Sequence, residues 1–186
     1  MGRWEPNARG RLAHAAMELF SERGFEQTTA LDIAQRAGLT ERTFYRTYAD
    51  KREVLFGNTH ELQDVILTTI AAQQDAASPM DIVATAITGT GAFFQDNRDY
   101  VRQRAAVLAS TPSLRERELL KLATMASGIA EALRQRGVTE PTATVAAETG
   151  VLVFKIGFQR WVDDDSVEEL SQAISETFDR FREVTG

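Results

Sequence analysis

A short segment between residues 40 and 48 carries side chains suited to contacting nucleic acid. Arg42 and Arg46 lie four residues apart. At about 100° per residue they fall on one side of a helix, whereas Phe44 and Tyr48 fall on the other. A guanidinium is permanently charged and fork-shaped, so it can bind a phosphate or the edge of a guanine. One side of this helix is therefore expected to pack and the other to meet a partner.

Residues around this helix add further groups that suit DNA. The methyl and hydroxyl of Thr43 fit a base edge, and the hydroxyl of Tyr45 can donate to a phosphate. Helices expected to begin at Thr28–Thr29 and at Lys51 would offer free backbone N–H groups, which bind phosphate. The alternative is that the basic side is simply the solvated face of a short helix. A merely solvated face would not need phosphate-binding groups on either side of it. The sequence therefore favours a helix that binds DNA, with the two neighbouring helix N-termini contacting the DNA backbone.

Three short helices are expected to position these groups. Apolar residues spaced by three and four predict a helix over 8–23, and Gly24 supplies its left-handed stop. Thr29 and Asp32 form a capping-box pattern for a second helix, which ends at Gly38. A third helix, capped by a threonine, follows the turn. Two short helices across a glycine-containing turn are typical of a helix-turn-helix.

The rest of the chain shows helical apolar spacing with few alternating runs. Further helices are expected over residues 51–74, 79–94, 98–109, 112–135, 141–162 and 167–184. Pro79, Pro112 and Pro141 each suit a first-turn position, where the missing N–H does no harm. The sequence therefore predicts an all-α fold, with a three-helix DNA-binding domain over 1–50 and a helical bundle over 51–186.

Composition narrows the class of protein and of site. The 186 residues, 43% hydrophobic and 26% charged, fit a soluble globular chain. The chain has no cysteine and two histidines, which excludes a disulfide framework and a closed zinc site, so neither a metal nor another cofactor is expected. The sequence shows no secretory signal and no run near the ~20 apolar residues of a membrane span. A cytoplasmic protein without a membrane partner is expected.

The formal net charge of -6 is unevenly distributed. Residues 1–55 hold nine Lys and Arg against eight Asp and Glu, a balance of +1, so the remaining 12 basic and 19 acidic residues give -7. The acidity therefore belongs to the second part of the chain. Local clustering of charge, rather than the whole-chain value, decides whether DNA can bind.

The segment 151–162 is apolar on nearly every side, so one face of a single subunit cannot bury it. A homodimer is therefore expected, and Gly150 and Gly157 would permit close helix approach. The predicted interface residues are Val151, Phe154, Gly157, Phe158, Trp161, Ile174, Phe178 and Phe181. The alternative is that this helix is the hydrophobic centre of a monomer. Two subunits would present two reading helices, which predicts a palindromic operator.

Aromatic and basic residues in the middle helices could line a pocket for a small-molecule effector. The candidates are Phe93, Phe94, Tyr100, Arg104, Leu108, Met125, Phe154, Lys155 and Phe158. The alternative is plain core packing, with Lys155 extended toward solvent or paired with Glu148. If Arg104 or Lys155 faces a cavity, an anionic or amphipathic effector is expected.

The run TTALDIAQRAGLTERTFYRTYADKREVLF, residues 28–56, resembles the DNA-binding region of the TetR family of bacterial regulators, and the likeness extends back to about residue 8. The resemblance implies a two-fold four-helix interface, repression of transcription, and core roles for Phe44 and Tyr48. It also implies these DNA contacts: Thr28 or Thr29, Thr40, Arg42, Thr43, Tyr45, Arg46 and Lys51. Arg42 departs from the family pattern, which often has a small residue there.

No motif of catalysis accompanies these features. The sequence lacks a di-metal Glu-x-x-His pattern, a nucleophile elbow and a phosphate-binding glycine loop, so an enzyme is not expected. Together with the resemblance, which implies repression, these features predict a ligand-responsive transcriptional repressor that binds a double-stranded operator as a homodimer and is released by a small molecule. In this hypothesis the helix over 51–74 acts as a lever between the two domains. The alternative is a helical protein-interaction module without DNA binding.

Overall fold

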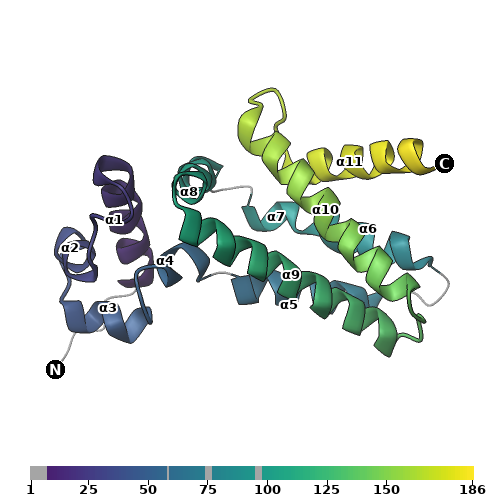
Figure 1. The fold of residues 1–186 in the computed structure, drawn as a ribbon, viewed down its shortest axis with the longest axis horizontal. Helices are drawn as coiled ribbons and strands as arrows, with labels where there is room; N and C mark the ends of the chain where they lie inside the picture. The colour runs from purple at the N-terminus through teal and green to yellow at the C-terminus, as the bar shows by residue number, and fades with distance from the viewer. Residues whose placement is uncertain (1–7, 58, 74–76, 95–97) are drawn as a thin grey trace. The chain divides into compact units, whose positions relative to one another are not determined.

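The computed structural model describes residues 8–57, 59–73, 77–94 and 98–186, and within these ranges it contains helices and no strands (Figure 1). The predicted all-α fold is confirmed. The chain divides into two compact units. Unit 1 comprises Met1–Asn58 and Arg102–Glu116, and unit 2 comprises Thr59–Val101 and Arg117–Gly186. The functional boundary expected between residues 50 and 51 stays a prediction.

Unit 1 contains the three helices of the predicted helix-turn-helix and one further turn. These are α1 (Ala8–Arg23), α2 (Ala30–Arg36), α3 (Glu41–Thr47) and α4 (Glu53–Phe56), joined by most of α8 (Arg98–Ser110) and the start of α9 (Pro112–Gln135). Helix α1 contacts α2, α3 and α4, and α2 contacts α3. The shared core includes the fully buried side chains of Leu12, Ile33 and Phe44.

Local capping defines the ends of these helices. Thr29 is the N-cap of α2, and its side chain and that of Asp32 form both bonds of the expected capping box. Thr40 caps α3 by accepting a hydrogen bond from the backbone N–H of Thr43. Gly24 and Gly38 have φ of 85° and 66°, a left-handed conformation that glycine adopts at little cost. The predicted caps and stops are confirmed.

Unit 2 is built from α5 (Thr59–Ala72), α6 (Pro79–Gly89), α7 (Gly91–Phe94), α10 (Thr142–Asp163), α11 (Leu170–Thr185), the first turn of α8 and most of α9. Helix α10 contacts both α6 and α11. Two glycines allow this: a Cβ on Gly150 would collide with Val83, and a Cβ on Gly157 would lie 2.9 Å from the Cα of Ile174. The expected close approach at Gly157 is therefore present within one subunit.

The prediction of a single helix over residues 51–74 is wrong. The structure has α4 in unit 1 and α5 in unit 2, and Gln74 lies outside the described residues. Arg9 donates from Nη2 to the carbonyl of Gly57 at 2.7 Å, which takes an acceptor that a continuous helix would use itself. The predicted lever would therefore consist of two helices, α4 and α5, instead of one, and its role in release from DNA stays a prediction.

Three other predicted boundaries also shift. The helix over 79–94 is divided at Thr90, whose buried hydroxyl donates to the carbonyl of Ile87 at 2.6 Å. Pro141 is the N-cap of α10 and precedes its first residue. The final helix begins at Leu170, because Asp164 forms a side-chain turn with Ser166 before it.

Candidate nucleic-acid interface

Helix α3 has one packed side and one exposed side. Phe44 is fully buried and Tyr48 nearly so, and their ring centroids lie 5.8 Å apart. Arg42 and Arg46 are exposed, and Tyr45 is 55% exposed while its ring meets the edge of Phe44 at 5.4 Å. The predicted two-sidedness is confirmed. The aromatic side holds α3 in the core and leaves the basic side open to a partner.

The exposed cations of α3 differ from the other cations around them. Among the described residues 8–57, Arg42 and Arg46 are the two cations without a hydrogen-bond or ion-pair partner. The partnered ones are Arg9 (carbonyl of Gly57), Arg11 (carbonyl of Ala37), Arg23 (Asp32), Arg36 (Glu18 and Glu22), Lys51 (backbone carbonyls) and Arg52 (Asp50). The free positive charge in this range therefore lies on one side of one helix.

The start of α2 has a distinct electrostatic character. Thr29 is exposed, and its hydroxyl and backbone N–H both donate to Asp32. These bonds, assisted by Arg23 at 2.7 Å, lower the pKa of Asp32 from 3.8 to about 2. On the neighbouring surface, hydrogen bonding to Arg36 lowers the pKa of Glu22. The N-terminus of α2 is thus already occupied by a carboxylate of its own chain.

Two predicted DNA contacts are otherwise engaged. Thr28 is 1% exposed, and its hydroxyl donates to the carbonyl of Gly24 at 2.9 Å. The ammonium of Lys51 donates to the carbonyls of Phe25 and Thr28 at 2.8 and 3.0 Å, and it lies 4.2 Å from the centroid of the Phe25 ring. Both side chains are thus used within unit 1, and a contact of either residue with DNA stays a prediction. Lys51 instead holds the turn that precedes α2.

The two threonines at the start of α3 contact one another. Their hydroxyls, on Thr40 and Thr43, lie 3.0 Å apart, and both residues are at least partly exposed. Each hydroxyl keeps further hydrogen-bonding capacity, because a hydroxyl has one donor and two acceptor positions.

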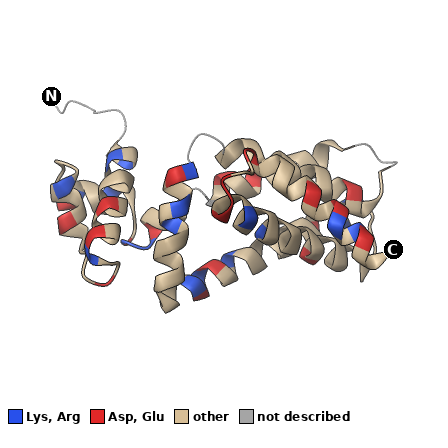
Figure 2. Cartoon of the chain, turned by 90° about the horizontal axis from the view of Figure 1, so that it is seen from above, with Lys and Arg blue, Asp and Glu red and all other residues tan. Residues whose placement is uncertain are grey.

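Acidic and basic residues are mixed along the helices of both units (Figure 2). Arg42 and Arg46 therefore differ from the other cations of residues 8–57 by their lack of ion pairs, and not by a surrounding cluster of basic residues.

The residues predicted to line an effector pocket are divided between the two units. In unit 1, Arg104 donates from Nε to the carbonyl of Leu55 at 2.6 Å, and Leu108 is buried. In unit 2, Met125 is buried, Tyr100 is half-buried and Lys155 is exposed. Neither basic candidate is therefore placed as an anion-binding group in a pocket.

The remaining candidates form an aromatic cluster in unit 2. Phe94 meets Phe158 edge to face at 5.4 Å, and Phe154 lies 5.6 Å from Phe158. Phe93 and Trp161 extend the cluster at 5.2 Å from Phe94 and 6.0 Å from Phe158. Phe93, Phe94 and Phe158 are half-buried, so the cluster keeps an accessible apolar side.

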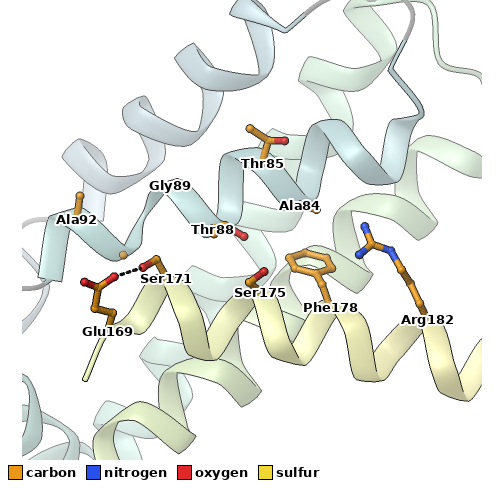
Figure 3. Close-up of a pocket in the computed structure, with 11 residues that line it drawn as sticks. Ala84, Thr85, Thr88, Gly89, Ala92, Glu169, Ser171, Ser175, Phe178 and Arg182 are labelled. Atoms are coloured by element: carbon orange, nitrogen blue, oxygen red, sulfur yellow. Dashed lines mark hydrogen bonds between the residues drawn. The ribbon is translucent and has the colours of Figure 1, made fainter. Parts of the chain in front are cut away.

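A groove lies elsewhere in unit 2, between α6–α7 and α11 (Figure 3). Its volume is about 730 Å³. Thr85 and Thr88 line it from one wall, and Ser171, Ser175 and Arg182 line it from the other. None of the residues predicted to bind an effector lines this groove. Sequence reasoning missed it because small polar residues on two separate helices carry no pocket pattern.

Most of the predicted dimer residues are buried within one subunit. Those with at most 7% exposure are Val151, Phe154, Trp161, Ile174 and Phe178, while Gly157 is buried and Phe158 and Phe181 are half-buried. The opposite side of α10 presents Val145, Leu152 and Ile156 at 57%, 46% and 47% exposure. Spacings of seven and four place these three on one face. One subunit therefore leaves apolar side chains of α10 exposed, on another face than the predicted interface residues, and the subunit interface itself stays a prediction.

Comparison with known proteins gives the same architecture. Residues 12–56 match the family described as bacterial regulatory proteins, tetR family, and residues 77–185 match the MftR C-terminal domain. A mycofactocin biosynthesis regulator, MftR, of Mycobacterium tuberculosis is 27% identical over 96% of this chain and 91% of its own.

Two solved structures share the fold. A SmeT–triclosan complex aligns with a TM-score of 0.64 and 19% identity, over 92% of this chain and 90% of its own. The FadR repressor of Thermus thermophilus in complex with lauroyl-CoA aligns with a TM-score of 0.54 and 22% identity, over 91% of each chain.

Two further findings concern the described residues alone. No helix among them is long and apolar enough to cross a membrane. Nor do they bring three or more His, Asp or Glu side chains together as a metal site. The helix-turn-helix geometry of unit 1, the helical unit 2 and the two family matches lead to one conclusion: this chain belongs to the TetR family of DNA-binding transcriptional regulators.

Proposed function

We propose that this protein is a ligand-responsive repressor, which binds a palindromic operator as a homodimer and leaves it when a small molecule binds. The observation that carries the DNA-binding part is the exposed side of α3, where Arg42 and Arg46 have no partner among the described residues 8–57. Thr40, Thr43 and Tyr45 would supply additional hydrogen bonds to the DNA, whereas both donors of Thr29 already bond to Asp32.

The homodimer follows from two requirements. One short helix reads few base pairs, so specificity needs two copies of α3 spaced by about one helical repeat of DNA, ~34 Å or a multiple of it. The exposed apolar face of α10, Val145, Leu152 and Ile156, also needs a cover. A two-fold axis satisfies both, since it places the same face of each subunit against its copy.

The aromatic cluster of unit 2 is the proposed effector site. The accessible sides of Phe93, Phe94 and Phe158 suit the apolar body of a small molecule. Two structural neighbours were solved with molecules that have large apolar parts, triclosan and lauroyl-CoA. Release from DNA requires that the effector bind one conformation better than the other, because equal affinity for both shifts no equilibrium.

DNA binding is tested first, and its dependence on the effector second. Duplexes retained by the protein from a random-sequence pool are sequenced, and a two-fold symmetric motif is the expected result. Arg46→Ala should reduce retention while the dimer mass in sedimentation stays unchanged. Retention that is insensitive to salt and to Arg46→Ala would favour a protein-interaction module instead.

The effector arm uses the indole of Trp161 as a reporter. Its ring lies 6.0 Å from Phe158, so a molecule bound at the cluster should change its fluorescence. Trp4 is replaced by Phe to leave one reporter. Triclosan and lauroyl-CoA serve as probes, and Phe94→Ala as the site variant. Binding of a probe without any change in operator affinity would refute the proposed release.

A further inference from the structure

The partner-free arginines of α3 sit at different positions along the helix. Arg42 is the second residue of α3 and Arg46 the sixth of its seven residues. At 1.5 Å per residue the two Cα atoms are separated by about 6 Å along the axis. In a helix-turn-helix it is the N-terminal part of the second helix that reaches base edges. Arg42 is therefore placed for the bases, and Arg46 lies nearer the end of the helix that leaves the groove.

The surroundings of Arg42 leave its guanidinium free for a shaped acceptor. The hydroxyls of Thr40 and Thr43, which flank it, bond to each other at 3.0 Å. Arg36 shows the contrast, because its two terminal nitrogens are already held by Glu22 and Glu18 at 2.8 and 3.2 Å. Arg42 thus keeps all its donors available, and it stands on a helix that Phe44 fixes in the core.

Guanine presents two adjacent acceptors, N7 and O6, in the major groove, and this pair matches the guanidinium fork. A lysine ammonium has the same charge but no fork, so it binds phosphate well and discriminates bases less. We infer that Arg42 reads a guanine in each half-site of the operator and that Arg46 holds a backbone phosphate. The inference rests on the proposed function and goes beyond it, since it assigns a base to Arg42 and a backbone phosphate to Arg46.

The test compares charge-preserving variants on duplexes recovered from a random-sequence pool. Wild-type protein should lose about 5- to 150-fold in affinity when the read guanine is exchanged for another base. It should also lose affinity when 7-deazaguanine, which lacks the N7 acceptor, takes that position. Arg42→Lys should bind both duplexes alike, whereas Arg46→Lys should keep the wild-type preference.

Arg52→Lys is the matched control, because Arg52 is exposed but paired with Asp50 at 3.2 Å. It should keep both affinity and base preference. All three variants replace exposed side chains, and an unchanged thermal midpoint confirms that each is folded. Arg46→Ala should lower affinity on all duplexes alike and reduce the dependence of log K on log salt by about one phosphate contact.

Other results of these experiments would refute the assignment of Arg42 to a guanine. A recovered motif without a guanine common to both half-sites, or an Arg42→Lys variant that still discriminates guanine, would overturn the inference while the proposed function stands. A guanine preference that is lost in Arg46→Lys instead would reverse the assignment and so refute it. Failure to recover any motif would overturn the proposed function and the inference together.

Discussion

Substituting Gly157 by alanine tests the packing of α10 on α11, which forms the frame of unit 2. In a helix interior, alanine is ordinarily more favourable than glycine by about 0.5–1 kcal/mol. Here the new methyl would lie 2.9 Å from the Cα of Ile174 and 3.1 Å from its backbone N. Carbon atoms pack best at about 3.5–4.0 Å, so two helix backbones would have to separate. Overpacking of this kind costs about 1–3 kcal/mol.

The expected net effect is a loss of about 0.5–2 kcal/mol in the free energy of unfolding, after the intrinsic gain of alanine is subtracted. Gly89→Ala is the matched control, because a Cβ there meets no atom within 4 Å, and it should be neutral or stabilising by up to about 1 kcal/mol. Urea denaturation followed by circular dichroism, at one fixed protein concentration, measures both. A Gly157→Ala protein at least as stable as the Gly89→Ala protein would show that α10 and α11 do not approach as described.

Three further predictions concern unit 1 and the contact between two subunits. Phe44→Ala should cost about 3–5 kcal/mol in the free energy of unfolding, because the ring is fully buried. Tyr45→Ala should cost clearly less, about 0.5–1.5 kcal/mol for its edge contact with Phe44, and should still weaken DNA binding. Equal losses of stability would contradict the two-sided helix. The pKa of Asp32 is lowered to about 2, so the stability that this carboxylate contributes is present above about pH 4 and is lost as pH falls toward 2. In Asp32→Asn the free energy of unfolding should therefore depend less on pH between about pH 4 and 2. An unchanged pH dependence in that range would disprove the contribution of the cap. Leu152→Glu with Ile156→Glu should yield folded monomers in sedimentation, and an intact dimer would place the interface elsewhere.

Features set by neighbours in the chain could be predicted from the sequence. The capping box at Thr29 and Asp32 needs only residues three apart, and the stop at Gly24 needs only a positive φ. The two sides of α3 likewise follow from its own periodicity. These features depend on local geometry, which the order of residues determines.

Features set by distant residues could not be predicted. The break after α4 involves Arg9, which is 48 residues from its partner Gly57. The pattern around Lys51 fits a phosphate contact as well as the internal bonds it makes to Phe25 and Thr28. The segment 151–162 of α10 is apolar on nearly every side, so its periodicity does not show which side meets α6 and α11. That choice depends on Val83 and Ile174 beside its two glycines.

The central claim is that the exposed basic side of α3 binds DNA, and two double variants with equal loss of charge test it directly. Arg42→Ala with Arg46→Ala removes the partner-free cations, while Arg36→Ala with Arg52→Ala removes two exposed cations that are already paired. Fluorescence anisotropy with one labelled duplex from the selected pool measures both affinities. The first variant should lose most of the affinity and the second should stay within a few fold of wild type. Equal losses in the two variants would contradict the claim, since they would show that overall charge rather than this side of α3 accounts for binding.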